Sequence, residues 1–216
     1  FPFITKYNNF TDDSKDYLQG IFDTILNKDI ARRLNIADTV SLENVTKFLF
    51  HSIGNKISPT KIANTLKSAG KTVDKYIKGL VDSMLIYEAG RYNIKGKQFL
   101  STQSKYYVVD VGMRNALVKS SESDIGHILE NIVYLELKRR YKNVYVGEID
   151  SGEVDFVSVN DNKYEYYQVS ATTLDENTLK RELAPFGKIK DNYPKYLLTL
   201  DDVFSNADYN GVQKIN

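Results

Sequence analysis

Four polar side chains stand where the surrounding sequence is apolar, and their types suit metal-ion chemistry. Glu130 falls at the margin of the apolar face of a predicted helix, Asp155 interrupts the run VDFVSV, and Gln168 and Ser170 close the run KYEYYQVS. A carboxylate on an apolar face is costly unless it is paired or binds a cation. Carboxylate oxygens are also the ligands that Mg²⁺ prefers. We therefore take Glu130, Asp155 and Gln168 as candidate catalytic residues, with Asp155 and Glu130 as weak ligands of Mg²⁺.

The carboxylates on this helix also have a purely structural interpretation. Glu136 falls inside the same apolar arc as Glu130. Both side chains could extend to solvent, or they could form ion pairs with nearby basic residues of the same helix, which are Lys138, Arg139 and Arg140.

The elements that must position these side chains are one helix and three strands. Apolar residues recur at helical spacing over residues 126–141, and three strand-like runs follow, NVYVGEI, VDFVSV and YEYYQVS. A further helix is predicted from Asp175 and Glu176 to about Asp191, and KYLLTL at 195–200 is predicted to be a buried strand. With a strand period of two, Gln168 and Ser170 point to one face and Val169 to the other.

This order of elements resembles that of the restriction-endonuclease-like, PD-(D/E)XK nucleases. In such a site the metal activates water and neutralises phosphate charge, and a lysine stabilises the transition state. Here Gln168 replaces the second acid and Ser170 replaces the lysine. A displaced cation would have to come from the next helix, which offers Lys180, Arg181 and Lys188. We expect a nuclease-like fold whose site is degenerate.

The first half of the chain is predicted to be helical and then to form a winged helix. Apolar residues at three- and four-residue spacing predict a helix from about Ser14 to Leu34. Over residues 41–109 we expect a helix capped by Ser41, a second with Ser58 as cap and Pro59 at its first position, and a third capped by Thr72. The second should stop at Gly70, and the two glycine-containing strands that follow would pair as a wing.

A winged helix can bind either DNA or protein, and both alternatives stay open. Five basic residues of the third helix and the wing are the candidate nucleic-acid contacts, namely Lys75, Lys78, Arg91, Lys95 and Lys97. They suit phosphate contacts. However, Asp74 and Asp82 share that helix, which carries no Asn, Gln or Arg at its centre to contact base edges.

Composition excludes several classes of protein. The 216 residues carry a formal net charge of +1, contain no cysteine, and include no run of eighteen apolar residues. Disulfides, thiolate zinc sites and a membrane span are therefore excluded, and a cytoplasmic location is expected. The first residues, FPFITKYNNF, do not form a signal peptide, and the final GVQKIN reads as a shortened strand. We expect an excised piece with sequence missing at both ends.

Segments along nearly the whole chain resemble the C-terminal region that follows the ATPase core in bacterial and archaeal AAA+ ATPases. The matching segments are YLQGIFDTILNKDIARR (17–33), YNIKGKQFL (92–100), KYYVVDVGMRNAL (105–117), GHILENIVYLELKRR (126–140), VYVGEIDSGEVDFV (144–157), YYQVSATTLDENTLKRE (166–182) and KIKDNYPKYLLTLD (188–201). The QVS form is usual in that family. The resemblance implies an upstream P-loop ATPase, a winged helix and a nuclease-like terminus. This chain has no GxxxxGK[ST], so ATP is expected only in the missing N-terminal domain.

Together these observations predict an α+β chain of three parts. Residues 1–38 would be a helical linker from the ATPase core, 39–119 a winged-helix domain, and 120–216 a PD-(D/E)XK nuclease-like domain with a mixed central sheet. The expected function is a non-catalytic recognition or regulatory region that binds nucleic acid or a protein partner. Its own ATPase domain would be a partner in cis, within an oligomer. The alternative is a Mg²⁺-dependent DNA nuclease with a displaced lysine.

Overall fold

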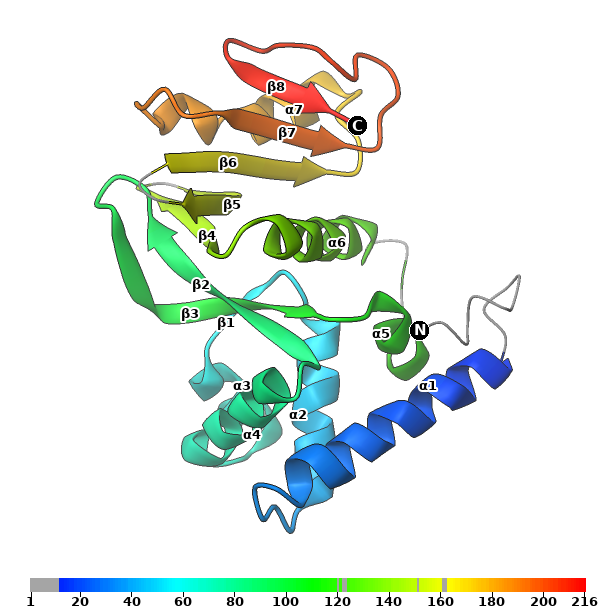
Figure 1. Ribbon diagram of the computed structural model, residues 1–216. Helices are drawn as coiled ribbons and strands as arrows, with labels where there is room; N and C mark the ends of the chain where they lie inside the picture. Colours follow the sequence, from blue (N-terminus) through cyan, green and yellow to red (C-terminus); the bar gives the residue numbers. More distant parts are fainter. Residues whose placement is uncertain (1–11, 120, 122–123, 151, 161–162) are drawn as a thin grey trace. The chain divides into compact units, whose positions relative to one another are not determined.

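The computed structural model describes residues 12–119, 121, 124–150, 152–160 and 163–216 (Figure 1). The first ten residues and the predicted domain boundary near Ser120 lie outside these ranges. Two compact units make up the chain. One comprises Phe1–Glu88 with Tyr106–Ser121, and the other comprises Ala89–Lys105 with Glu122–Asn216. The α+β class and the mixed central sheet are confirmed.

The first unit is mainly helical. Its elements are α1 (Asp12–Thr24), the π-helix η2 (Ile25–Ala31), α2 (Thr39–His51), β1 (Lys56–Ile57), α3 (Pro59–Leu66), α4 (Gly70–Asp82) and α5 (Val111–Leu117). The strands β2 (Ile86–Asn93) and β3 (Gln98–Val108) belong to it only through the first residues of β2 and the last residues of β3. From α2 to β3 the element order is the one a winged helix requires, and the assignment itself stays a prediction.

The core of this unit joins apolar stripes of its helices. Fully buried side chains include Leu18 and Phe22 of α1 and Phe50 of α2, and the two phenylalanine rings lie 6.3 Å apart between centroids. Gly79 of α4 permits a close approach, since a Cβ atom there would lie 2.8 Å from atoms of Ile30 and Leu34. The side chains of Ile30 and Leu34 thus occupy the space that a larger residue at position 79 would need.

Four predicted helix boundaries in this unit were wrong. The first helix changes from α to π geometry at Ile25 instead of continuing to Leu34. The cap of α2 is Asp38, whose carboxylate accepts a hydrogen bond from Ser41 N at 2.9 Å. Helix α3 begins as predicted, with Ser58 as cap and Pro59 as first residue, but it ends at Leu66, and Lys67 after it adopts the left-handed conformation.

The glycine expected to end α3 instead begins the next helix. Gly70 is the first residue of α4, and Ala69 at the cap position provides no side-chain hydrogen bond. Thr72 therefore lies inside the helix. The segment after Asp110 forms α5, for which no helix was predicted. Asp110 Oδ1 accepts a hydrogen bond from Met113 N at 2.6 Å and caps this helix.

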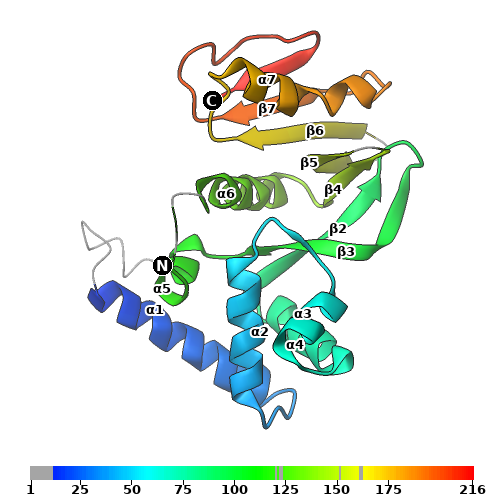
Figure 2. The same cartoon turned by 180° about the vertical axis from the view of Figure 1, so that it is seen from behind.

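The second unit is built on a mixed sheet with the strand order β3-β2-β4-β5-β6-β7-β8 (Figures 1 and 2). Its further elements are α6 (Ile125–Arg140), β4 (Val144–Ile149), β5 (Gly152–Asn160), β6 (Lys163–Ser170), α7 (Glu176–Leu183), the 3₁₀ helix η4 (Phe186–Lys188), β7 (Lys195–Thr199) and β8 (Val212–Ile215). Strands β4, β5 and β6 are antiparallel, whereas the pairs β2–β4, β6–β7 and β7–β8 are parallel. The predicted α6 and strands are confirmed.

Helices α6 and α7 cover opposite faces of this sheet. Phe156 and Tyr167 are register partners, and they contact Tyr134 and Tyr141 at α6. The next pair, Val157 and Tyr166, therefore points to the other face, where it joins a core that includes Phe186, Ile189, Leu197 and, at its edge, Leu179 and Leu183 of α7. Figure 1 accordingly shows α7 behind β7, and Figure 2 shows it in front.

Helix α7 is shorter than predicted. It ends at Leu183 instead of continuing to about Asp191, and a single 3₁₀ turn follows. Pro185 explains the difference, because proline lacks the N–H that an α-helix needs and clashes with the preceding turn.

Candidate functional site

The second unit brings the three candidate catalytic residues together around one hollow. Glu130 of α6, Asp155 of β5 and Gln168 of β6 all line it, and Ser170 lies on its rim. The hollow has a volume of about 480 Å³. Because β5 and β6 are neighbouring antiparallel strands, Asp155 and Gln168 come within hydrogen-bond distance although thirteen residues separate them. The predicted convergence of these three residues is thus observed.

A lysine that sequence reasoning missed occupies the middle of the carboxylates. Lys105 Nζ of β3 lies 2.9 Å from Glu130 Oε1, 2.7 Å from Glu153 Oε1 and 3.8 Å from Asp155 Oδ1. The lysine side chain is only 5% exposed, and those of Glu130 and Asp155 are each 11% exposed. We call these four residues the carboxylate–lysine cluster. It is a buried ion network in which three acids surround one ammonium group.

Burial and charge move the pKa values of this cluster in different directions. Burial, reinforced by Glu130, raises the pKa of Asp155 to about 8, although Lys105 and a hydrogen bond from Val169 N oppose the rise. Burial alone would lower the pKa of Lys105, but the charges of Glu130, Asp155 and Glu153 outweigh it and raise that pKa. The ammonium therefore stays charged, and burial favours the protonated form of Asp155.

Gln168 is fully engaged with its neighbours. Its Oε1 accepts a hydrogen bond from Asp155 N at 3.3 Å, and its Nε2 donates to Glu182 Oε2 of α7 at 2.9 Å. The amide thus links β5, β6 and α7. A glutamate at this position could not donate to Glu182, and the two carboxylates would repel each other.

Of the three basic residues considered as a displaced cation, Lys180, Arg181 and Lys188, only Arg181 lines the hollow. Arg181 lines the hollow and lies 2.9 Å from Glu182 Oε1. Lys180 instead pairs with Glu176 on the exposed side of α7, and Lys188 lines a separate pocket. Glu136, the other acid expected on the apolar arc, pairs with Arg139 and Arg140 at the surface, so its structural interpretation is correct.

These donors do not suit a Mg²⁺ ion in the observed arrangement. Lys105 holds the place between the carboxylates that a cation would need, and the Gln168 carbonyl already accepts from Asp155 N. Within the described residues, no group of three or more His, Cys, Asp or Glu side chains is arranged to hold a metal ion. A metal at Asp155 and Glu130 would first have to displace Lys105.

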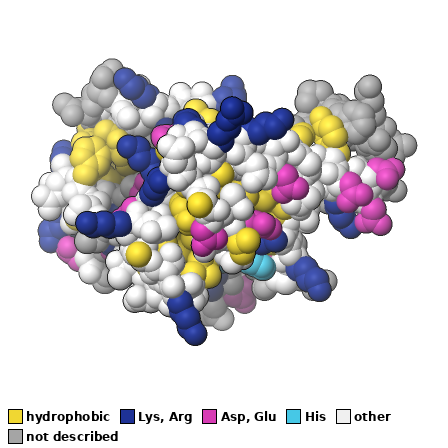
Figure 3. Space-filling view, turned by 90° about the horizontal axis from the view of Figure 1, so that it is seen from below, with side chains coloured by type: hydrophobic (Ala, Val, Ile, Leu, Met, Phe, Trp, Pro, Cys, Tyr) yellow, Lys and Arg dark blue, Asp and Glu magenta, His cyan; other side chains and the backbone are white. Residues whose placement is uncertain are grey.

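The five candidate nucleic-acid contacts are divided between the two units. Lys75 and Lys78 are exposed on α4 of the first unit. Arg91, only 12% exposed, binds Glu148 of β4 at 2.6 Å, and Lys95 binds Asp150 at 2.8 Å. Lys97 lies over the ring of Tyr164, 5.5 Å from its centroid. On the face in view in Figure 3, Lys and Arg side chains are interspersed with acidic and apolar side chains.

Two polar groups outside the predicted set are also buried in the second unit. Lys214 of β8 lies 3.0 Å from Asp201 Oδ2, and the same oxygen accepts from Thr173 N at 2.8 Å. Burial opposes ionisation of Asp201, but hydrogen bonds from Thr172, Thr173 and Lys214 prevail and lower its pKa. Only the lysine within the final GVQKIN run hinted at this pair.

The fold and site define an α+β protein with a buried carboxylate–lysine cluster beside a mixed sheet. The chain belongs to the family described as "Domain of unknown function (DUF8612)", whose model matches residues 1–124. The match includes Lys105 but ends before Glu130 and Asp155. No helix in the described ranges has the length and apolar character needed to cross a membrane.

Two relatives and one solved structure are similar to the chain. An "Uncharacterized protein" of Haemophilus influenzae is 38% identical over 203 residues, which cover 92% of this chain and 50% of that protein. "Uncharacterized protein MJ1544" of Methanocaldococcus jannaschii is 34% identical over 199 residues, 88% of this chain and 42% of that protein. The chain thus spans half or less of each relative. The crystal structure of protein VC1899 from Vibrio cholerae covers 83% of this chain and 47% of that one, with a TM-score of 0.24 and 10% identity.

Proposed function

We propose that this chain is a non-catalytic recognition or regulatory region that follows the ATPase core of an AAA+ ATPase. The observation that carries the non-catalytic part is the position of Lys105 Nζ, which lies between 2.7 and 3.8 Å from three carboxylates. The resemblance of the sequence to such C-terminal regions supports the rest. In this proposal ATP is bound by the ATPase domain in cis, and the protein acts in the cytoplasm as part of an oligomer.

The cluster in this proposal has a structural role in place of a catalytic one. Lys105 belongs to β3, Glu130 to α6, and Glu153 and Asp155 to β5, so one ammonium group joins three elements. Taking charges out of water is costly, and removing one partner of such a network leaves the others uncompensated. The cluster would therefore fix α6 on the sheet and keep the hollow in one arrangement.

A second function, a Mg²⁺-dependent nuclease, would give the same lysine another role. Such a nuclease needs a cation beside its acids, and Ser170 does not supply one. Lys105 lies 3.8 Å from Asp155 Oδ1 and could take that role if a metal displaced it from Glu130. The two functions differ in whether a divalent cation enters the cluster.

A cleavage assay separates the two functions. Supercoiled plasmid and single-stranded DNA are incubated with the chain and Mg²⁺ or Mn²⁺, and the products are followed on gels. We expect no nicking by the unmodified chain. Asp155→Ala tests the acid, and Lys142→Ala, which alters an exposed lysine, is the matched control. Metal-dependent nicking that is lost in Asp155→Ala and kept in Lys142→Ala would make the chain a nuclease.

The recognition part of the proposal is tested by binding. Phosphate contacts by the α4 and wing lysines would give weak binding that decreases steeply with salt and depends little on sequence. Reversing Lys75 and Lys95 to Glu should abolish a gel shift that depends on the winged helix. An unchanged shift in that double variant would exclude these two lysines as nucleic-acid contacts, and a protein would then be the expected partner.

A further inference from the structure

The pocket between the end of β2 and the 3₁₀ turn after α7 combines an apolar floor with a basic rim. Its floor consists of three isoleucines that also belong to the core of the second unit, Ile94, Ile149 and Ile189. Four lysines and two aspartates line the remainder, namely Lys95, Lys97, Lys188, Lys190, Asp150 and Asp191. The volume is about 610 Å³. A pocket of this kind is large enough for a ring-bearing anion.

Both aspartates of this pocket are already neutralised by groups of the chain itself. Asp150 Oδ2 lies 2.8 Å from Lys95 Nζ. Asp191 Oδ2 accepts a hydrogen bond of 2.6 Å from Tyr166 OH, and Asp191 Oδ1 lies 3.9 Å from Lys195 Nζ. The pocket therefore presents no unpaired acid to a ligand, and its net charge of four lysines less two aspartates is +2.

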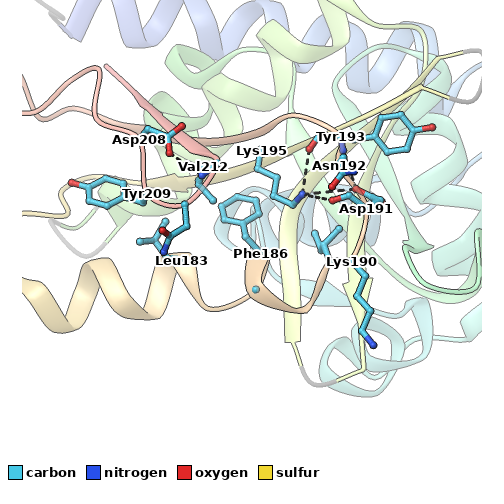
Figure 4. A pocket seen from close by; sticks show the side chains of 14 residues that line it. Leu183, Phe186, Lys190, Asp191, Asn192, Tyr193, Lys195, Asp208, Tyr209 and Val212 are labelled. Atoms are coloured by element: carbon cyan, nitrogen blue, oxygen red, sulfur yellow. Dashed lines mark hydrogen bonds and ion pairs between the residues drawn. The ribbon is translucent and has the colours of Figure 1, made fainter.

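Two exposed lysines remain available on the rim. In the described part of the chain, neither Lys97 nor Lys190 lies within ion-pair distance of a carboxylate. Figure 4 shows the Lys190 side chain extending away from Lys195, which is itself held by Asp191 and Tyr193. Lys97 and Lys190 can thus contact an anion without breaking an existing ion pair.

A second apolar surface lies beside Lys97. Phe99 is 65% exposed and does not line the pocket. It packs on Tyr92 and Tyr145 at centroid distances of 5.4 and 5.0 Å, and Tyr92 in turn contacts Tyr164, the ring beneath Lys97. An exposed aromatic side chain packed on other aromatic rings, in a region that also carries a lysine, suits the stacking of nucleobases.

We propose that the isoleucine pocket, Lys97, Lys190 and Phe99 form a binding site for single-stranded nucleic acid. One base would rest on the isoleucine floor, a second would stack on Phe99, and the intervening phosphate would contact the two lysines. Two separate apolar surfaces around one cationic rim fit a strand better than a free nucleotide, which has one base. The site rests on the proposed recognition function and gives that function a ligand and a location.

The test is fluorescence anisotropy of a labelled twelve-residue oligothymidylate with the full chain at low salt. The double reversal Lys97→Glu/Lys190→Glu should weaken binding at least about tenfold, because phosphate contacts dominate affinity. Phe99→Ala should weaken it by about tenfold through lost stacking. The control Lys119→Glu/Lys142→Glu makes the same charge change at exposed positions and should change affinity less than about twofold. Circular dichroism melts confirm that each variant is folded.

Competition experiments with other anions distinguish a nucleic-acid strand from a free nucleotide, from phosphate and from an acidic protein. Adenosine monophosphate or inorganic phosphate should compete only weakly with the labelled oligonucleotide. If either competes as well as unlabelled oligonucleotide does, the proposal that the ligand is a nucleic-acid strand is wrong. An acidic peptide that binds at Lys97 and Lys190 in place of the oligonucleotide would identify a protein partner instead. The site would also be rejected if the reversal of Lys97 and Lys190 left affinity unchanged, or if the control reversal weakened binding equally. The plasmid cleavage assay does not depend on any of these binding results. The proposed strand-binding site and the proposed lack of nuclease activity can therefore be rejected independently.

Discussion

Lys105 Nζ and Glu130 Oε1 lie 2.9 Å apart, although twenty-five residues separate them in the chain. The pair joins strand β3 to helix α6, and Glu153 and Asp155 extend it to β5. It gives the carboxylates an internal cation, so the behaviour of the cluster depends first on this lysine.

Lys105→Met is expected to lower the free energy of unfolding by about 3–5 kcal/mol at neutral pH, because the buried Glu130 and Asp155 and the partly buried Glu153 lose their common cation. Urea unfolding followed by circular dichroism measures the change. Lys142→Met, at an exposed position, should be nearly neutral. Mg²⁺ should stabilise Lys105→Met more than the unmodified chain, since the ammonium no longer occupies the cluster. Equal stability of the two methionine variants would contradict this account.

Asp155 should make the chain less stable as pH rises from about 4 to 8. Its pKa is raised from an ordinary value of 3.8 to about 8 in the folded chain, so the folded state binds more protons than the unfolded state over this range. Since one pKa unit corresponds to about 1.4 kcal/mol, the free energy of unfolding should decrease by up to about 5 kcal/mol over this range. Asp155→Asn keeps an acceptor for Val169 N and should flatten the dependence. A slope unchanged in that variant would assign the effect to other groups.

The buried pair Asp201–Lys214 should act in the opposite direction. The pKa of Asp201 is lowered, so its stabilising effect is present above the ordinary carboxyl pKa and is lost as pH falls below it. Lys214→Met should cost about 3–5 kcal/mol at neutral pH, because Asp201 stays buried without its cation. The loss should become smaller under acidic conditions. Denaturant unfolding at several pH values, with Lys163→Met as control, would show whether it does.

Gly147→Ala should destabilise the second unit by about 1–3 kcal/mol through overpacking. A Cβ atom there would lie 2.9 Å from Ile94 Cδ1 and 3.3 Å from Val154 Cβ. Adding Ile94→Val, which removes the nearer atom, should restore part of the loss. Gly20→Ala is the matched control, since no atom lies within 4 Å of its Cβ position and alanine favours a helix. Thermal melts that rank the two alanine variants in the reverse order would refute the close approach.

Local pattern was sufficient for most elements of this chain. Helical spacing predicted α6 to within about one residue, and alternating apolar runs predicted β4, β5 and β6. Ser58 and Pro59 predicted the start of α3 correctly, because a cap depends on residues close in sequence. Asp155 was identified because it interrupts an apolar run. The prediction that its strand neighbours the strand of Gln168 is confirmed, since the two residues form a hydrogen bond.

The sequence could not determine which charged side chains form ion pairs with one another. Lys105 stands between the polar run STQS and the apolar run YYVV, and no spacing rule connects it to Glu130. The contact arises only when β3 and α6 assemble around the sheet. The caps at Asp38 and Asp110 were also missed, since several polar residues compete locally and tertiary packing selects one. The sequence by itself determined the α+β class and the convergence of Glu130, Asp155 and Gln168. Only the tertiary structure placed an ammonium group among the carboxylates, because ion pairs between distant segments depend on the geometry of the assembled core and not on local sequence.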